Sequence, residues 1–260
     1  MLTGKRAVIT GSTSGIGLGI ARELASNGVD VVLNGFGDPT AIEKERINIE
    51  LEYPVRVFYL EADLSCAQAA RGFIEEAAEA LGGIDILVNN AGIQHTDRVE
   101  DFPIERWNAV IALNLSAVFH TSAAALPYMK QQGWGRIINI ASAHGLVASA
   151  NKSAYVAAKH GVIGLTKVTA LENAGQGITA NAICPGWVRT ELVEKQIEAL
   201  AASTGTSVDE AASVLLAEKQ PSGQFVTPQQ VGAMAAFLAS EAADQINGAS
   251  LSVDGGWTAQ

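Results

Sequence analysis

Tyr155 and Lys159, four positions apart, are the residues whose types and spacing most directly suggest chemistry. Such residues lie on the same face of a helix. The Lys159 ammonium could therefore stabilise the Tyr155 phenolate and bring its pKa, ordinarily about 10, towards neutrality. Ser142 follows a strand-like run, residues 136–140, and could hold a substrate oxygen beside the phenol. Surface tyrosines and lysines often share this spacing by chance, so the interpretation depends on the surrounding sequence.

A glycine-rich turn near the amino end supplies the first supporting feature. The strand-like run 5–10 leads into Gly-Ser-Thr-Ser-Gly-Ile-Gly at 11–17, and Ile16, Ile20 and Leu24 continue at helical spacing. A strand, such a turn and a helix N-terminus predict a pyrophosphate site, because glycines admit phosphates close to the backbone and the helix end offers N–H groups and a positive dipole. Tight packing of the glycines is the alternative, since the spacing differs from the commoner G-x-G-x-x-G.

More motifs follow in a fixed order along the chain. Asn-Asn-Ala-Gly at 89–92 comes after the strand-like run 84–88, and Pro-Gly at 185–186 comes after the run 178–184. Asn114, Ser142 and the pair of Tyr155 and Lys159 lie between these two motifs. Together with the glycine-rich turn, this set resembles the classical short-chain dehydrogenase/reductase family over essentially the whole chain. The joint occurrence is far more specific than any single motif.

The strand-like runs also predict the fold. Besides 5–10, they lie at 29–34, 55–61, 84–88, 136–141, 178–184 and 249–253, with helical stretches between most of them. Alternating strands and helices predict a parallel sheet covered on both faces, with its ligand site at the carboxyl ends of the strands. We therefore expect an α/β protein: a single-domain, doubly wound parallel sheet of the Rossmann type over residues 1–260.

One segment, residues 191–225, fits no strand of this core. Leu192, Val193, Gln196, Ile197 and Leu200 recur at helical spacing, and residues 211–218 form a second apolar helix. The family resemblance implies a helical lid over the substrate, mobile without ligand and placing Gln196 when closed. The alternative is a rigid amphipathic pair of helices packed on the core.

The resemblance implies a catalytic set of Asn114, Ser142, Tyr155 and Lys159. Tyr155 acts as general base on an alcohol and as general acid in the reverse direction. Lys159 lowers the phenol pKa and binds the nicotinamide ribose, Ser142 hydrogen-bonds the substrate oxygen, and Asn114 holds a water that leads from the lysine towards solvent. The implied cofactor contacts are Gly11, Thr13, Ser14, Gly15, Ile16, Gly17, Phe36, Asp63, Leu64, Asn90, Gly92, Tyr155, Lys159, Pro185, Val188 and Thr190.

The turn at 34–37, Asn-Gly-Phe-Gly, bears on the choice of cofactor. In the family this turn meets the adenosine ribose, and members that prefer NADP place an arginine or lysine there or in the glycine-rich turn to pair with the 2′-phosphate. Neither segment contains a cation here, which predicts NAD. The acid of many NAD-specific members is absent too, so we expect Asn34 or the backbone near Gly35 and Phe36 to serve the ribose. Simple turn packing is the alternative for Phe36.

Residues beside the common motifs must select the substrate. The candidates are Gln94, Ser142, His144, Lys152, Tyr155, Trp187, Gln196 and Trp257. Singly, a histidine or tryptophan is often structural and a loop lysine solvated, but one cation, one titratable donor and two amides together suit a small carboxylate. Residues 142–149, 151–155 and 185–190 resemble bacterial D-3-hydroxybutyrate dehydrogenases within the family. The resemblance implies NAD-dependent oxidation of D-3-hydroxybutyrate to acetoacetate, with Gln94, His144, Lys152 and Gln196 on the carboxylate.

Two other functions remain possible at this stage. The first is a different enzyme of the same fold, such as a 3-oxoacyl-carrier-protein reductase or a sugar or polyol dehydrogenase. A bulky thioester would have little use for Lys152 and His144. The second is a non-catalytic nucleotide-sensing protein, which would usually have lost Tyr155 or Lys159.

Composition limits the partners. The net charge of −10 argues against nucleic acid, and we expect no membrane segment because no uninterrupted apolar run approaches the ~20 residues of a spanning helix. Only Cys66 and Cys184 are present, and no His/Cys spacing suggests a metal. With no signal peptide apparent, a cytoplasmic location is the simplest expectation. The family resemblance implies a homotetramer, with helices around 105–129 and 153–173 at one interface.

Overall fold

The computed structural model of the protein describes residues 2–259, apart from the side chain of Leu192. Within these residues, seven parallel strands form one sheet in the order β3-β2-β1-β4-β5-β6-β7. The chain changes direction across the sheet between β1 and β4, which creates the crevice where open α/β sheets bind ligands. The predicted strands and Rossmann-type fold are confirmed. The strands are β1 (Arg6–Ile9), β2 (Asp30–Leu33), β3 (Val57–Tyr59), β4 (Ile86–Asn89), β5 (Gly135–Ile140), β6 (Ile178–Pro185) and β7 (Ser250–Val253).

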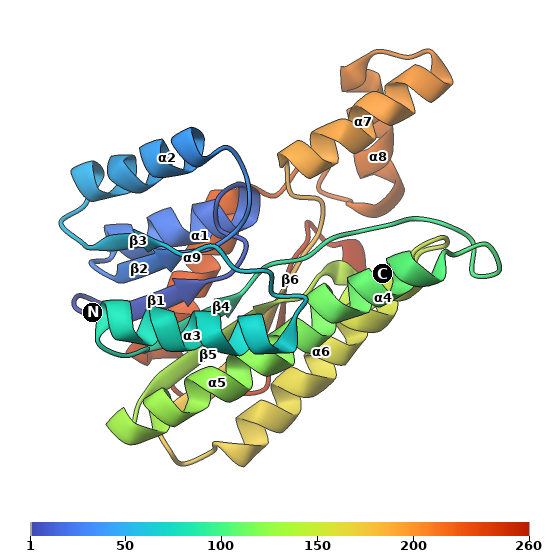
Figure 1. The fold of residues 1–260 in the computed structure, drawn as a ribbon. Helices are drawn as coiled ribbons and strands as arrows, with labels where there is room; N and C mark the ends of the chain where they lie inside the picture. Colours follow the sequence, from blue (N-terminus) through green and yellow to red (C-terminus); the bar gives the residue numbers. More distant parts are fainter. Residues whose placement is uncertain (1, 260) are drawn as a thin grey trace.

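Helices cover both faces of the sheet, with α1 and α9 on one face and α3, α5 and α6 on the other (Figure 1). Side chains alternate along a strand, so Ala7 and Ile9 of β1 join the core under α1 and α9, whereas Val8 joins the core under α3 and α5. The helices are α1 (Gly15–Ser26), α2 (Pro39–Glu52), α3 (Ala67–Leu81), α4 (Ile104–Ile111), α5 (Ala117–Gln132), α6 (Ser153–Glu172), α7 (Glu191–Thr204), α8 (Val208–Lys219) and α9 (Pro228–Ala239).

A buried polar network fixes α5 and α6 against the central strands. The Asn89 amide donates to the Asn139 side chain at 2.8 Å and to Ser122 at 3.1 Å, and it accepts from the Thr121 hydroxyl at 2.6 Å. The Asn139 amide in turn donates to Thr166 of α6 at 2.8 Å. Buried polar groups satisfied in this way specify one arrangement of the elements. The network therefore sets the register of α6, whose first turns carry Tyr155 and Lys159.

A π-helical turn, Ala112–Ser116, joins α4 to α5 in one long helix. Residues Ile104–Gln132 are nevertheless long and apolar enough to span a bilayer by length and composition, although polar residues such as Asn114 and Thr121 divide the run. Core helices pass the same test, and this helix packs against α3, α6 and β5. The π turn was not predicted. Such turns often occur at functional sites.

α7 and α8 stand out from the body of the protein as a pair of helices (Figure 1). They correspond to the predicted lid segment and share a small core of their own, which includes Val193, Ile197 and Ala211. Two contacts close the base of the pair: Val188 bridges Val226, and the Trp187 N–H donates to the Gln220 side chain at 2.8 Å. The pair is therefore joined to the core at both ends. The lid's mobility stays a prediction.

Candidate active site

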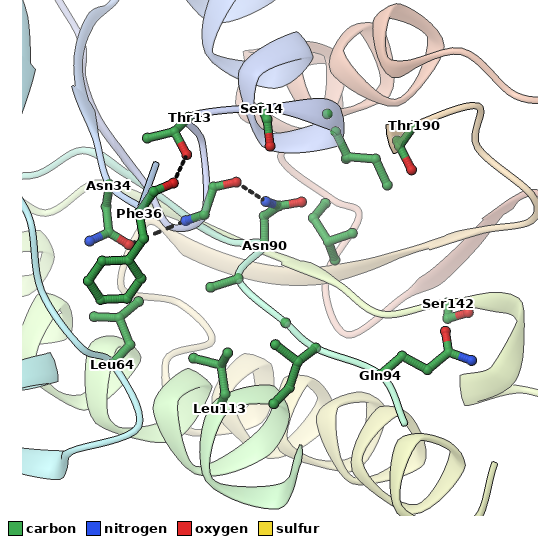
Figure 2. A pocket seen from close by; sticks show the side chains of 18 of the residues that line it. Thr13, Ser14, Asn34, Phe36, Leu64, Asn90, Gln94, Leu113, Ser142 and Thr190 are labelled. Carbon is green, nitrogen blue, oxygen red and sulfur yellow. Dashed lines mark hydrogen bonds between the residues drawn. The ribbon is translucent and has the colours of Figure 1, made fainter. Parts of the chain in front are cut away.

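A cleft opens at the carboxyl ends of the strands (Figure 2). It is the position that the fold predicts for a ligand. Most of the predicted cofactor residues line this cleft: Gly11, Thr13, Ser14, Gly15, Ile16, Phe36, Asp63, Leu64, Asn90, Gly92, Tyr155, Lys159, Pro185 and Thr190. Gly17 and Val188 are not among the residues that line it. Val188 lines a smaller adjoining cavity instead.

The glycine-rich turn forms the wall at the start of α1. Gly11 and Gly15 have φ values of 61° and 56°, which favour glycine. At Gly17 the reason is space, because a Cβ there would lie 2.5 Å from the nitrogen of the Asn90 side-chain amide. Gly17 thus serves close packing behind the turn. Ser14 makes no side-chain capping bond to α1, unlike Ser207 of α8. The first N–H groups of α1 therefore face the cleft without a side-chain cap, which fits a pyrophosphate.

Asn90 and Thr10 bind the neighbouring strand ends together. The Asn90 amide donates to the carbonyls of Thr10 and Gly11 at 3.0 and 2.8 Å, and the Thr10 hydroxyl accepts the N–H groups of Asn90 and Ala91 at 2.9 and 3.0 Å. Figure 2 shows Asn90 pointing towards the glycine-rich turn. The Asn-Asn-Ala-Gly motif therefore fixes the floor of the cleft through its side chains as well as its backbone.

Asn34 lines the cleft, but hydrogen bonds within the protein hold its side chain, and its predicted role at the ribose stays a prediction. Asn34 is 1% exposed, accepts from the Gly11 N–H at 3.3 Å and donates to the Leu60 carbonyl at 3.1 Å. These bonds make it a structural link between strand ends. Phe36 is 62% exposed at the rim, and its carbonyl accepts from the Thr13 hydroxyl at 3.2 Å. Its side chain is available to a ligand instead of packing in the turn.

Three of the catalytic candidates, Ser142, Tyr155 and Lys159, line the cleft together. The Lys159 ammonium is buried, donates to the Ile140 carbonyl at 2.7 Å and lies 5.6 Å from the centre of the Tyr155 ring. Burial lowers the pKa of Lys159 to about 8. Ser142 begins the short turn Ala143–Gly145, where its hydroxyl accepts the His144 N–H at 3.1 Å. One helix and one strand end thus deliver all three groups.

The pKa of Tyr155 differs from the sequence expectation. Burial raises the pKa of its hydroxyl, and a hydrogen bond with Ser142 opposes this effect. We expected Lys159 to lower the pKa, but its ammonium gives a hydrogen bond to the backbone of β5, and burial of the phenol dominates in the protein alone. The Tyr155 side chain remains half-exposed to the cleft, so a ligand can reach it.

Asn114 lies in the π turn and is completely buried. Its side chain accepts the Ile93 N–H at 2.9 Å and donates to the Ile93 carbonyl at 2.8 Å. It therefore holds the segment that follows Gly92 against the helix, and it does not line the cleft. The water predicted beside Asn114 stays a prediction. It would have to bond to the Asn114 backbone, or to the side chain at a position that the two bonds to Ile93 leave free.

A second, smaller cavity adjoins the cleft beside Tyr155. Every predicted substrate residue lines it: Gln94, Ser142, His144, Lys152, Tyr155, Trp187, Gln196 and Trp257. Gln94 and Ser142 line both spaces, and Figure 2 shows them next to each other at one end of the cleft. Four separate parts of the chain, including the lid helix α7, therefore contribute to one small enclosure.

Aromatic rings form one wall of this cavity. Trp187 and Trp257 stack with ring centres 5.8 Å apart. The His144 ring is roughly perpendicular to Trp257 and to Tyr155, with ring centres 5.0 Å and 5.9 Å apart. Lys152 Nζ lies 5.0 Å from the centre of the Trp187 ring, a cation–π contact. The enclosure thus combines an apolar wall with a cation, as expected for a small anionic ligand.

Charge and hydrogen-bonding capacity in the cavity favour an anion. Burial lowers the pKa of His144 to about 4, so this ring is neutral at pH 7, and its Nε2 lies 2.9 Å from the Ser149 hydroxyl. Burial also lowers the pKa of Lys152, while Glu218 opposes the shift. Two buried donors, Gln94 Nε2 and Trp187 Nε1, have no hydrogen-bond partner in the described part of the protein. A buried donor without a partner costs free energy, and a ligand that accepts a hydrogen bond from it removes this cost.

Some residues of the site were not predicted from the sequence. Gln220 is 1% exposed and orients the Trp187 backbone from 33 positions away. Val193 and Gly186 line the substrate cavity, and Gly186 could have been found from its Pro-Gly motif. Among residues 2–259, no group of three or more His, Cys, Asp or Glu could hold a metal.

Comparisons with known proteins agree with this geometry. A family model described as enoyl-(acyl carrier protein) reductase matches residues 11–258. The chain is similar to the D-beta-hydroxybutyrate dehydrogenases of Cupriavidus necator, at 60% identity over 100% of both chains, and of Rhizobium meliloti, at 52% over 98% of this chain and 99% of the relative. The structure of L-sorbose reductase from Gluconobacter frateurii with NADPH and L-sorbose superposes with a TM-score of 0.94, at 29% identity over 99% and 98% of the chains.

The chain therefore belongs to the short-chain dehydrogenase/reductase family of oxidoreductases. The uncapped helix N-terminus and the buried Lys159 make the cleft suitable for a nicotinamide dinucleotide, the kind of cofactor that the L-sorbose reductase structure contains.

Proposed function

We propose that the protein oxidises D-3-hydroxybutyrate to acetoacetate, reversibly, with NAD as the hydride acceptor. The observation that carries the proposal is the meeting of Gln94, His144, Lys152 and Gln196 in one cavity beside Tyr155. A cation and three uncharged polar groups can surround a carboxylate, while the tryptophan wall accommodates the short carbon chain. The names of the two relatives with 60% and 52% identity support the same substrate.

Ser142, Tyr155 and Lys159 each have a different role in the proton transfer. Ser142 hydrogen-bonds the substrate oxygen and strengthens this bond as negative charge develops there. Tyr155 removes the hydroxyl proton in oxidation and returns it in reduction. With a pKa of about 8, Lys159 is largely protonated at pH 7, so its charge favours the phenolate despite the burial of both groups. A bound oxidised nicotinamide supplies the hydride acceptor and a positive charge.

NAD is proposed over NADP on the charge of the cleft. Lys159 is the one cation among the described residues that line it, and it lies at the catalytic end. At the adenosine end, Thr13, Phe36 and Asp63 offer a hydroxyl, a ring and a carboxylate. A 2′-phosphate there would lose hydration without gaining a cation, at a cost of roughly 2 kcal/mol, or about 30-fold in kcat/KM.

Steady-state assays of each enantiomer of 3-hydroxybutyrate with NAD and NADP test the proposal. We expect turnover of the D enantiomer with NAD at about 30-fold or higher efficiency than with NADP. A preference for the L enantiomer, or no oxidation of either, would remove the substrate assignment and leave the family. In that event, a thioester, sugar or polyol substrate becomes the better hypothesis, and the same assay format distinguishes these.

We further propose that the protein is a cytoplasmic homotetramer that binds neither nucleic acid nor membrane. Apolar side chains on the outer faces of α5 and α6 support the subunit contact: Phe119 is 48% exposed, Val168 50% and Leu171 78%. The net charge of −10 supports the exclusion of nucleic acid.

A further inference from the structure

The turn before α6 has a backbone conformation that the mechanism above does not use. Asn151 has a φ of 64° and is the one non-glycine residue with positive φ in the part of the chain that the structure describes. Asparagine tolerates this left-handed region better than most residues, and β-branched residues tolerate it worst. Strained residues of this kind persist where the surroundings hold them, often at functional sites.

The contacts that hold Asn151 connect two parts of the substrate cavity. The Asp97 N–H donates to the Asn151 carbonyl at 2.9 Å, and Asp97 pairs with Lys152 in a parallel bridge. Asp97 follows Gln94 by three residues, and Lys152 follows Asn151 directly. This bridge therefore joins the segment that carries Gln94 to the segment that carries Lys152.

The Asn151 side chain makes no comparable contribution. It is exposed, and it takes part in none of the hydrogen bonds described between residues 2 and 259. Ala150 is exposed as well, but without a positive φ. A change at Asn151 therefore acts through the backbone of the turn.

We propose that Asn151 is a positioning residue, whose left-handed turn directs the Lys152 side chain into the substrate cavity against Trp187. Lys152 lies just outside α6, at φ −123° and ψ 31°, so the hydrogen bonds of the helix interior do not fix its direction. Its Nζ nevertheless lies 5.0 Å from the Trp187 ring centre, and the side chain is half-buried. The inference rests on the proposed function for the identity of the carboxylate, but not for the orientation of Lys152.

Three variants test this role: Asn151→Val, Asn151→Gly and the matched control Ala150→Val. Glycine adopts positive φ freely and valine does not. The first measurement is KM and kcat for D-3-hydroxybutyrate. The second is the pKa of Lys152, from competitive labelling with acetic anhydride and mass spectrometry, which needs no substrate. In Asn151→Val we expect KM to rise about tenfold with kcat within about threefold, and the pKa of Lys152 to rise towards its ordinary value. Asn151→Gly and Ala150→Val should match the wild type.

Two results would overturn the proposal. One is an Asn151→Val protein with unchanged KM and unchanged Lys152 labelling. The other is equal change in Asn151→Val and Asn151→Gly, since the side chain itself would then matter. If Asn151→Val does not fold, Asn151→Ala provides a milder strain with the same readouts. If the wild type does not oxidise D-3-hydroxybutyrate, the proposed function fails, and the labelling still decides whether Asn151 orients Lys152.

Discussion

Replacing Lys152 by methionine tests the substrate cavity most directly. Lys152 is the one cation among the described residues that line this cavity, and methionine keeps most of the side chain's volume against Trp187. Loss of a charge-assisted hydrogen bond to a carboxylate costs about 1.5–3 kcal/mol, which lowers kcat/KM by about 10-fold to 100-fold. Because the side chain is half-buried, water can replace part of the interaction, and we expect the lower half of this range.

The assay compares D-3-hydroxybutyrate with its methyl ester in the wild type and in Lys152→Met. The acid should lose efficiency and the ester should not, because the ester has no carboxylate to lose its partner. The affinity for NADH should stay close to that of the wild type. Lys195→Met is the matched control, because Lys195 lies in the lid helix α7 but is exposed and paired with Glu191 at 2.7 Å.

The comparison of acid and ester makes the reasoning refutable. Equal losses for both substrates would mean that Lys152 supports the cavity through its packing on Trp187 instead of binding charge. No loss for the acid would mean that Gln94, His144 and Gln196 hold the carboxylate without the lysine.

Two further predictions concern the other polar residues of the site. Tyr155→Phe should lower kcat by about 10²–10⁴-fold while NADH still binds, and near-normal turnover of a folded variant would exclude Tyr155 as the acid and base. His144 has a folded-state pKa of about 4, below its ordinary 6.5. Below pH 6.5 the unfolded chain therefore binds more protons at this histidine than the folded protein does. The contribution of the neutral ring to the free energy of unfolding is complete above pH 6.5 and is lost as pH falls towards 4, by up to about 3 kcal/mol. Urea unfolding across this range should show a shallower pH dependence in His144→Gln than in the wild type, and identical slopes would contradict the buried neutral ring.

The sequence was sufficient to predict the sheet and most of the site, because both depend on short-range patterns. Buried parallel strands appear as continuous apolar runs, and several motifs follow such a run closely, as Ser142 follows β5. Tyr155 and Lys159 share a helix, so their relation is fixed by helical geometry. The substrate residues depended on resemblance, since Gln94, Lys152 and Trp257 come from distant segments.

The features that were not predicted all depend on long-range contacts. The hydrogen bonds of the Asn34 side chain to Gly11 and Leu60 cross the sheet, and no local pattern indicates them. Gln220 follows α8, and it meets Trp187 because the chain returns to the base of the lid after α7 and α8. The π turn around Asn114 needs the Ile93 backbone as its partner, and no local pattern predicts that contact.

The stacked pair of Trp187 and Trp257 gives the protein an internal optical probe. Two of its four tryptophans lie at the wall that meets the ligand, with ring planes 28° apart. Coupling between such close indoles contributes to near-ultraviolet circular dichroism, and we expect the fluorescence of Trp187 to respond to the charge of Lys152, which lies 5.0 Å from its ring centre. Entry of an anion should change both signals before any reduced cofactor has formed. Rapid mixing could therefore time substrate binding separately from hydride transfer, without an added label.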